Sequence, residues 1–242
     1  MGLVRGELIL KYWQDDPQSY VNLAGESRKT YLHPYLRRVI HEARCETILD
    51  YGCGDGALFL EGDVVAKETW LYDNSKRMMD FAKINFADRP GYKFLDDIES
   101  APSDYYDAVI LSLVLMTIPS LDEQSFVLRQ MARAKKDTGI ALVAVTHPCF
   151  RQYRFSTFST EFALGNEFPY LQNGIPFQVM LEDRDSSASV QFTDYHWNLS
   201  ATINTIVDAG LAIEQIVELP DRPVLDSWHN ANFPGYMVIR CS

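Results

Sequence analysis

The sequence predicts an α/β protein with a doubly wound, mostly parallel sheet. Two observations favour this class: short apolar runs alternate with helical segments through residue 146, and polar residues follow the runs directly. Hydrophobic residues also make up 47% of the 242 residues, which is an ordinary globular composition able to fill a core. Right-handed crossovers between such strands produce an open parallel sheet, so we expect one domain over residues 1–242.

The first half of the chain contains three predicted strands and two predicted helices. In residues 30–44, four apolar side chains recur at the helical spacing. Ser75 stands where a cap is expected for the second helix. The predicted elements are a helix over 30–44, strands over 47–51, 69–72 and 92–95, and a helix over 76–87.

The second half predicts the centre and the far edge of the sheet. Residues 107–113 are apolar on both faces, as in a central parallel strand. Ser120-Leu121-Asp122-Glu123 has the form of a capping box, and Gly210 is placed to end a helix. The predicted elements are a helix through Ala134, a strand over 139–146, a helix over 198–209 and apolar runs over 211–219 and 236–240.

Residues 147–197 interrupt the alternation. The segment is rich in aromatic residues and turn formers, and a loop of this length usually serves as a lid or a cap. Its aromatic content disfavours disorder. We therefore predict a small cap inserted after the fifth strand, in the position of a substrate-binding insertion.

The charge balance restricts the partners. Lys and Arg number 22 against 33 Asp and Glu, which gives a net charge of −11 and disfavours both a nucleic-acid groove and an anionic membrane. Four cysteines occur without a CxxC pair, so no metal site is expected. The start of the chain is unlike a signal peptide, and no apolar run approaches a membrane span. These features predict a cytoplasmic protein.

The first strand runs into a glycine-rich turn, Asp50-Tyr51-Gly52-Cys53-Gly54-Asp55-Gly56. Glycines allow the backbone to turn tightly and to approach a ligand closely. Dinucleotide-binding turns use G-x-G-x-x-G and hold a pyrophosphate, which Asp50 and Asp55 would repel. Carboxylates here suit a ligand with a cationic group, while the alternative is a tight turn without a ligand.

Two further acids follow the second and third strands. Asp73 could accept hydrogen bonds from ribose hydroxyls, or it could simply lie beside a helix cap supplied by Asn74 or Ser75. Asp97 could accept from an adenine amino group, although Asp96 and Glu99 are close enough for a solvated acidic loop. In open α/β sheets ligands bind beyond the carboxyl ends of the strands, where all of these residues are predicted to lie.

Together these motifs resemble the class I S-adenosylmethionine-dependent methyltransferases of the small-molecule type. The resemblance rests on DYGCGDG, LYDNS, FLDDI and YYDAVILSLVLMTIP, and covers residues 45–146 and the two final strands. It implies a seven-stranded, Rossmann-like sheet with a reversed carboxyl-terminal hairpin, and S-adenosyl-L-methionine as the cofactor. The cofactor residues that it implies, with Asn74 added beside Asp73, are Asp50, Gly52, Gly54, Asp73, Asn74, Asp97, Ile98, Ser112 and Leu113.

The chain departs from the family pattern at two places. Lys136-Asp137-Thr138-Gly139 stands where the family often has Pro-Gly-Gly, at a turn expected away from the cofactor. Ser112-Leu113-Val114-Leu115 replaces the Asn-Pro-Pro-Tyr motif that accompanies methylation of nucleobase or glutamine amino groups. That kind of acceptor is therefore not supported.

Candidates for the acceptor and for proton removal lie in the predicted cap. His147 directly follows the fifth strand, and His196 stands in Asp194-Tyr195-His196-Trp197. Either imidazole could act as a general base or could be structural. The predicted substrate contacts are His147, Tyr153, Tyr195, His196 and Trp197; His33, His41 and His229 have weaker claims.

Residues 1–44 are predicted to form a helical lid, with Tyr12, Trp13, Tyr20 and Arg28 placed to close over the cofactor. The alternative is a helix packed on the sheet edge. The acidic surface and the aromatic cap favour a small, partly apolar acceptor over nucleic acid. An NAD(P)-linked oxidoreductase and a non-catalytic S-adenosylmethionine-binding module remain as alternative functions, and the atom that receives the methyl group is open.

Overall fold

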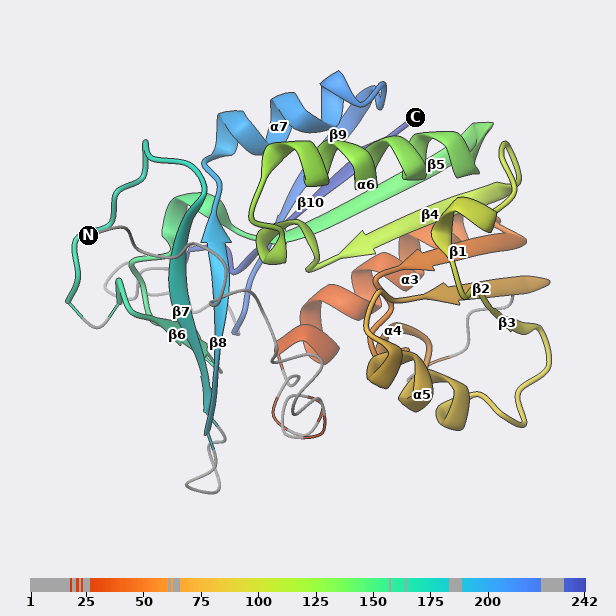
Figure 1. Cartoon of the computed structure of the whole chain (residues 1–242), viewed down its shortest axis with the longest axis horizontal. Coiled ribbons are helices and arrows are strands. Elements are labelled where there is room, and N and C mark those ends of the chain that lie inside the picture. Colours follow the sequence, from red (N-terminus) through yellow and green to blue (C-terminus); the bar gives the residue numbers. More distant parts are fainter. Residues whose placement is uncertain are drawn as a thin grey trace, which may run out of the picture.

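The structure is a computed structural model (Figure 1). It describes residues 18, 21, 23, 27–60, 62, 66–156, 158–163, 165–182, 189–222 and 233–242. The predicted lid contacts Tyr12, Trp13 and Tyr20, and also His229, lie outside the described residues.

A seven-stranded mixed sheet forms the centre of the protein, in the order β3-β2-β1-β4-β5-β10-β9. The first five strands pair in parallel, and β10 is antiparallel to both β5 and β9. The predicted sheet with its reversed carboxyl-terminal hairpin is therefore confirmed. The strands are β1 (Thr47–Tyr51), β2 (Glu68–Tyr72), β3 (Tyr92–Phe94), β4 (Tyr106–Ser112), β5 (Lys135–Thr146), β9 (Ile213–Leu219) and β10 (Tyr236–Cys241).

Helices cover both faces of this sheet (Figure 1). On one face α3 (His33–Glu42), α4 (Ala57–Leu60) and α5 (Lys76–Asn85) pack against a buried apolar cluster. On the other face α6 (Leu121–Ala134) and α7 (Leu199–Asp208) pack against a second cluster. The central strand β4 supplies side chains alternately to the two clusters, which explains why its sequence is apolar on both faces.

Most predicted boundaries agree with the structure within two residues. Ser75 accepts from the Met78 amide and Ser120 from the Glu123 amide, so both predicted serine caps are present. One boundary differs clearly: β5 begins at Lys135 rather than at residue 139. It begins earlier because Tyr106 of β4 pairs with Lys135 ahead of a register shift, which the predicted turn before Gly139 does not anticipate.

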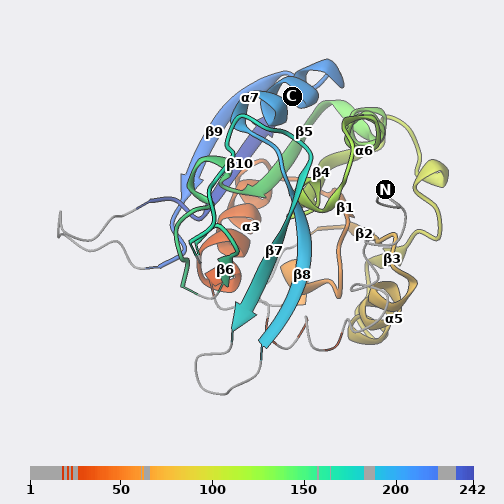
Figure 2. The ribbon, with the colours of Figure 1, turned by 60° about the vertical axis from the view of Figure 1, so that its left-hand side comes forward.

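Residues 147–197 contain a second, smaller sheet. The strands β6 (Phe158–Thr160), β7 (Ile175–Glu182) and β8 (Ser189–His196) pair antiparallel and have a phenylalanine-rich core of their own. Figures 1 and 2 show this sheet beside the main sheet, at the end toward which β4 points. The Trp197 indole donates to the Ile118 carbonyl at 3.1 Å, which fastens the segment to the loop after β4.

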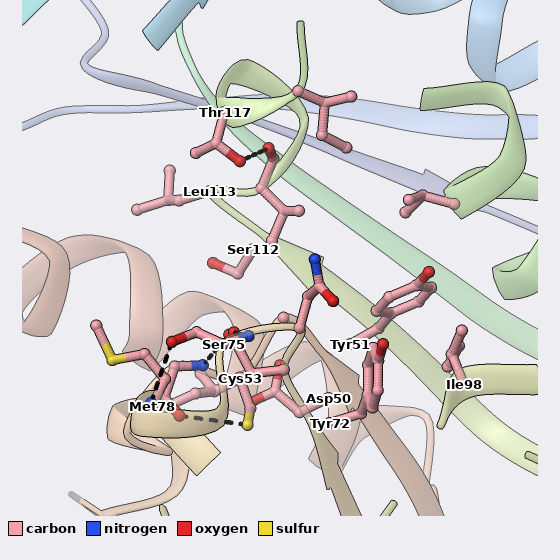
Figure 3. Close-up of a pocket in the computed structure, with 18 of the residues that line it drawn as sticks. Asp50, Tyr51, Cys53, Tyr72, Ser75, Met78, Ile98, Ser112, Leu113 and Thr117 are labelled. Atoms are coloured by element: carbon pink, nitrogen blue, oxygen red, sulfur yellow. Dashed lines mark hydrogen bonds between the residues drawn. The ribbon is translucent and has the colours of Figure 1, made fainter. Parts of the chain in front are cut away.

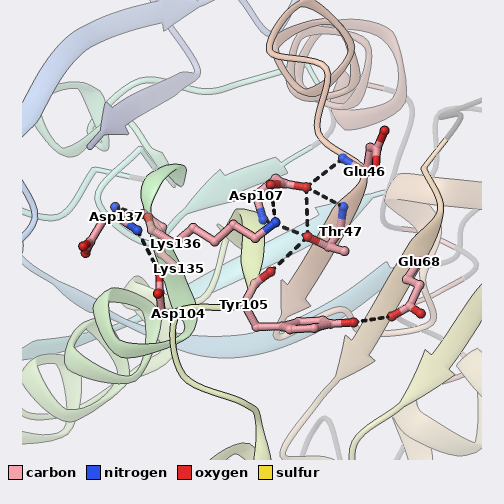
Figure 4. A network of polar contacts seen from close by, with 9 residues as sticks. All are labelled: Glu46, Thr47, Glu68, Asp104, Tyr105, Asp107, Lys135, Lys136 and Asp137. Carbon is pink, nitrogen blue, oxygen red and sulfur yellow. Dashed lines mark hydrogen bonds and ion pairs between the residues drawn. The ribbon is translucent and has the colours of Figure 1, made fainter.

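A polar network ties the strands together at the opposite, amino-terminal edge (Figure 4). The Asp107 carboxylate accepts from the Glu46 amide, from the Thr47 amide and hydroxyl, and from Lys136 Nζ, at 2.7–3.0 Å. Burial acts to raise the pKa of Asp107, but the Lys136 and Thr47 hydrogen bonds outweigh it and lower the pKa to about 2. The network thus joins the starts of β1, β4 and β5.

We expect Asp107→Ala to lower the free energy of unfolding by about 1.5–3 kcal/mol at pH 7, the range for hydrogen bonds to a charged group. Urea denaturation measures this loss. Because the folded pKa is depressed, the contribution is present above the ordinary pKa of 3.8 and is lost as the pH falls toward 2. Asp96→Ala is the control, since the Asp96 side chain is 94% exposed. Equal stability of the two variants would contradict the assigned role.

Candidate cofactor and acceptor site

A cavity of about 830 Å³ lies at the carboxyl ends of β1, β2 and β4. Its volume falls in the range of small-ligand sites. Figure 3 shows Ser112, Leu113 and Thr117 on one side and Cys53, Ser75 and Met78 on the other. Eight of the nine predicted cofactor residues line this cavity: Asp50, Gly52, Gly54, Asp73, Asn74, Ile98, Ser112 and Leu113.

The glycine turn forms one wall, and its glycines have distinct roles. Gly52 and Gly54 both have positive φ, +82° and +58°, a region that other residues rarely adopt. A Cβ on Gly52 would come within 2.4 Å of Val114 Cγ2, so Gly52 is required for packing. Apart from its chain neighbours, no heavy atom of the described residues lies within 4 Å of a Cβ built on Gly54. Gly54 therefore leaves space for a ligand among the described residues of this wall.

Asp73 braces the glycine turn from the end of β2. Its carboxylate accepts from the Gly54 amide at 2.9 Å and from the Ser75 amide at 2.8 Å. The cap of α5 is supplied by Ser75 instead, through the Met78 amide. Burial raises the pKa of Asp73, and the two backbone hydrogen bonds oppose that rise. Asp73 thus lines the cavity as a half-buried acceptor and does not itself cap the helix.

Asp50 is the most deeply buried carboxyl group of the cavity wall, with 2% exposure. Burial, and secondarily the nearby Asp73 and Asp55, raise its pKa from 3.8 to about 8. Among the described residues no hydrogen-bond donor or cation pairs with this carboxyl group. A cationic ligand group at this position would stabilise the ionised form, as the ammonium group of S-adenosylmethionine can. The Asp50 carboxyl group therefore fits that cofactor.

The end of β4 contributes an unusual backbone conformation. Leu113 has φ +59°, which is uncommon for a residue with a side chain. Its amide donates to the Ala144 carbonyl at 2.8 Å, which fixes it against β5. Such conformations cluster at ligand sites, and Leu113 with Ser112 lines the cavity.

Asp97 is the predicted cofactor residue that lies outside the cavity lining. Its carboxylate accepts from the Glu99 amide at 3.0 Å and caps the short helix η2 (Ile98–Ser100). Its neighbour Ile98 is buried and lines the cavity. A contact between Asp97 and adenine stays a prediction.

The predicted cap contacts lie outside the described lining as well. With Nδ1 accepting from the Cys149 amide, the neutral His147 ring carries its proton on Nε2, which lies 2.7 Å from Glu218 Oε1. His196 Nε2 lies 2.9 Å from the Tyr170 carbonyl, and burial, with a smaller effect of Arg151, lowers the pKa of His196 to about 4. Burial also lowers the pKa of His147, against the effect of Glu218. A base role for either ring stays a prediction.

The other three predicted cap contacts differ in their exposure and in their bonds to the cavity wall. Tyr153 is 41% exposed and stacks on Phe233. Tyr195 is buried, and Trp197 bonds to the carbonyl of Ile118, which lines the cavity.

Several lining residues have no counterpart in the sequence prediction. The loop after β4 and the first turns of α6 form a further wall with Ile118, Pro119, Asp122, Glu123 and Phe126. His33 and Arg28 also line the cavity, and of these two Arg28 is the residue that the sequence predicts to close over the cofactor. The capping box at Ser120 could have identified the α6 wall from sequence. A helix that starts just after the carboxyl end of a strand begins at the edge of the sheet where ligands bind.

Comparisons with known proteins identify the family of this chain. A family model described as "Methyltransferase domain" matches residues 23–174. A search of curated proteins gives no match. The chain belongs to the methyltransferase domain family and is an S-adenosylmethionine-dependent methyltransferase.

Solved structures show the same fold. An S-adenosylmethionine-dependent methyltransferase from Mesorhizobium loti is 20% identical with a TM-score of 0.60, covering 90% of this chain and 99% of that one. A putative S-adenosylmethionine-dependent methyltransferase from Listeria monocytogenes is 22% identical, with a TM-score of 0.56 and coverage of 84% and 96%. The N-methyltransferase NodS from Bradyrhizobium japonicum WM9 is 11% identical, with a TM-score of 0.55 and coverage of 87% and 93%.

The described residues contain neither a membrane-spanning helix nor a metal-binding cluster. No helix in that part of the chain is long and apolar enough to cross a membrane. Within the same residues no group of three His, Cys, Asp or Glu side chains is arranged to hold a metal ion.

Proposed function

We propose that this methyltransferase methylates a small, partly apolar molecule that enters between the loop after β4 and the start of α6. The observation that carries the proposal is the division of the cavity wall. The glycine turn, Asp73 and Ile98 suit the cofactor, while Ile118, Phe126 and the residues around them form a separate, mixed apolar and acidic wall. A volume of about 830 Å³ leaves room for a small acceptor beside the cofactor, and not for a folded macromolecule.

The cofactor, when bound, supplies a methyl group already activated on a positively charged sulfur. The chain therefore has to position the two molecules and exclude water. Asp50 would hold the ammonium group, Asp73 the ribose hydroxyls, and the backbone at Ser112–Leu113 the methionine part. Gly54 keeps the path along the turn open, because none of the described side chains lies where its Cβ would be.

The electrostatics of the cavity support a cationic ligand. Five carboxyl groups line it, and Arg28 is the single Lys or Arg in the described lining; the carboxyl groups are those of Asp50, Asp55, Asp73, Asp122 and Glu123. An NAD pyrophosphate in this cavity would face repulsion, whereas a sulfonium with an ammonium group would be attracted. The charge distribution thus favours methyl transfer over the oxidoreductase alternative.

The acceptor wall combines apolar surface with the two acidic side chains of Asp122 and Glu123. Phe126 is 41% exposed and lies one helical turn after Asp122. The small sheet adjoins this wall, because β8 lies beside η3 (Leu115–Thr117) and Trp197 bonds to Ile118. We propose that residues 147–197 close the acceptor side as a cap, and that the cap histidines position it through their hydrogen bonds.

The proposal is tested by incubating the protein with methyl-tritiated S-adenosylmethionine and a cell extract, then separating the products by size. We expect label in the fraction of small, organic-extractable molecules. Gly54→Val protein is the control for labelling that does not depend on the site. Label found solely in protein, RNA or DNA would contradict the proposal.

Cofactor affinity should depend on pH through Asp50. Because its pKa is about 8 in the free protein, binding of an ammonium group below pH 8 requires loss of a proton. We expect the Kd of S-adenosylhomocysteine to fall by up to about 50-fold from pH 6 to pH 8, measured by titration calorimetry. Above pH 8 the ligand's own amino group loses its charge and the gain ends.

Asp50→Asn is the matched control, because the asparagine side chain has the same shape as aspartate but does not ionise. Its affinity should be weaker and nearly independent of pH between 6 and 8. If the Kd of the variant changed with pH as much as that of the wild type, another group would be responsible for the pH dependence.

A further inference from the structure

The proposed cofactor contacts leave one charged group of S-adenosylmethionine without a partner. Asp50 suits the ammonium group, and Asp73 suits the ribose, but both would repel the methionine carboxylate. A carboxylate in a cavity lined by five acids needs a cation close by. The inference below rests on the proposed function, since it concerns the same cavity.

The lining residues that come first in the sequence include a π-helical turn, Arg28–Leu32. The His33 amide donates to the Arg28 carbonyl, which is the i→i+5 bond that defines such a turn. Arg28 and His33 therefore lie one turn apart on the same face of the helix, while Leu32 remains fully buried in the core. The π turn thus brings both Arg28 and His33 to the cavity, and such turns are frequent at functional sites.

The face of α3 that carries His33 adjoins the glycine turn. Arg37 lies one helical turn after His33, and its Nη1 donates to the Leu58 carbonyl at 2.9 Å. Leu58, Ala57 and Gly54 line the cavity together with His33. The pair is therefore located on the side of the cavity where the methionine part of the cofactor is proposed to lie.

His33 carries an unused hydrogen-bonding atom at this position. Its side chain is 3% exposed, and Nδ1 has no partner among the described residues. Burial, followed by Arg28, Arg37 and Lys29, lowers the pKa of His33 to about 2, so the ring is neutral. A neutral imidazole can donate one N–H to an anion without adding charge to the site. Leaving such a buried atom unpaired is costly, which points to a ligand as its partner.

We propose that Arg28 and His33 bind the α-carboxylate of the methionine part of the cofactor. Arg28 supplies the positive charge in a planar fork that matches a carboxylate. His33 donates from Nδ1 to the same group. The two residues would thereby distinguish the complete cofactor from adenosine compounds that lack the amino-acid part.

Titration calorimetry with three ligands tests this proposal. S-adenosylhomocysteine has the carboxylate, its decarboxylated amine lacks that group alone, and 5′-methylthioadenosine lacks the whole amino-acid part. We expect the wild type to lose about 10-fold or more in affinity when the carboxylate is removed. Arg28→Gln and His33→Leu should each weaken S-adenosylhomocysteine by about 10-fold or more and leave the other two ligands unchanged.

His33→Asn provides the rescue, because its amide can donate close to the Nδ1 position; its affinity should stay within about 3-fold of the wild type. Equal affinity of the wild type for S-adenosylhomocysteine and its decarboxylated amine would overturn the proposal without any variant. A uniform loss for all three ligands in Arg28→Gln would overturn it too, since the residue would then only shape the cavity. Failure of the wild type to bind any of them would instead refute the assigned cofactor site.

Discussion

Gly54→Val is expected to abolish measurable binding of S-adenosylmethionine and S-adenosylhomocysteine, with a loss of at least about 100-fold, or 2.7 kcal/mol. In the described part of the chain, nothing beyond the neighbouring residues lies within 4 Å of a Cβ at this position, so the branched side chain is expected to enter the cavity. It would occupy the space proposed for the methionine part of the cofactor. Titration calorimetry on the folded variant measures the effect.

The control has to carry the same backbone strain, because valine at positive φ is unfavourable anywhere. Gly210 has φ +91° and lies after α7, outside the described cavity lining. As at Gly54, a Cβ there would meet nothing within 4 Å in the described structure beyond the neighbouring residues. Gly210→Val should lose stability but keep its affinity. Unchanged affinity in Gly54→Val would show that the cofactor does not pass this turn.

Asp73→Ala has the second large expected effect, a loss of about 1.5–3 kcal/mol in cofactor binding. The carboxylate belongs to a half-buried residue of the cavity lining and would accept from ribose hydroxyls. The sequence alone suggests little change in stability. The structure alters that expectation, because the carboxylate also accepts from the Gly54 and Ser75 amides, and losing both bonds should destabilise the fold.

Two comparisons separate binding from stability. Ser120→Ala removes the α6 cap, outside the described cavity lining, and should lower stability by about 1 kcal/mol with unchanged affinity. In the wild type, 5′-methylthioadenosine should bind more tightly than its 2′-deoxy form, and this preference should disappear in Asp73→Ala. A preference that persists in the variant would assign the ribose to another residue.

The parts of the fold that followed from sequence were those with local signals. The apolar runs over 47–51 and 107–113 identified β1 and β4 because buried parallel strands need apolar side chains on both faces. Ser75 and Ser120 identified two helix starts because their hydroxyls satisfy free backbone amides. The early start of β5 at Lys135 depends on pairing with Tyr106 of a neighbouring strand, and no local signal encodes that pairing.

The candidate site divides in the same way. Asp50, Gly54, Asp73 and Ser112 could be placed together from sequence, because the ends of parallel strands meet at one edge. The cap histidines could not be placed, since their neighbours Glu218 and Tyr170 come from separate segments.

By itself, the sequence determined the class of sheet, the glycine turn, the acids at the strand ends and hence the methyltransferase family. The tertiary structure decided which helical side chains complete the cavity: Arg28 and His33 from the π turn, and Asp122, Glu123 and Phe126 from α6. The physical reason is that a strand end fixes the location of its last side chains. A helix face is directed by packing against the sheet, and one π turn is enough to shift which residues it presents.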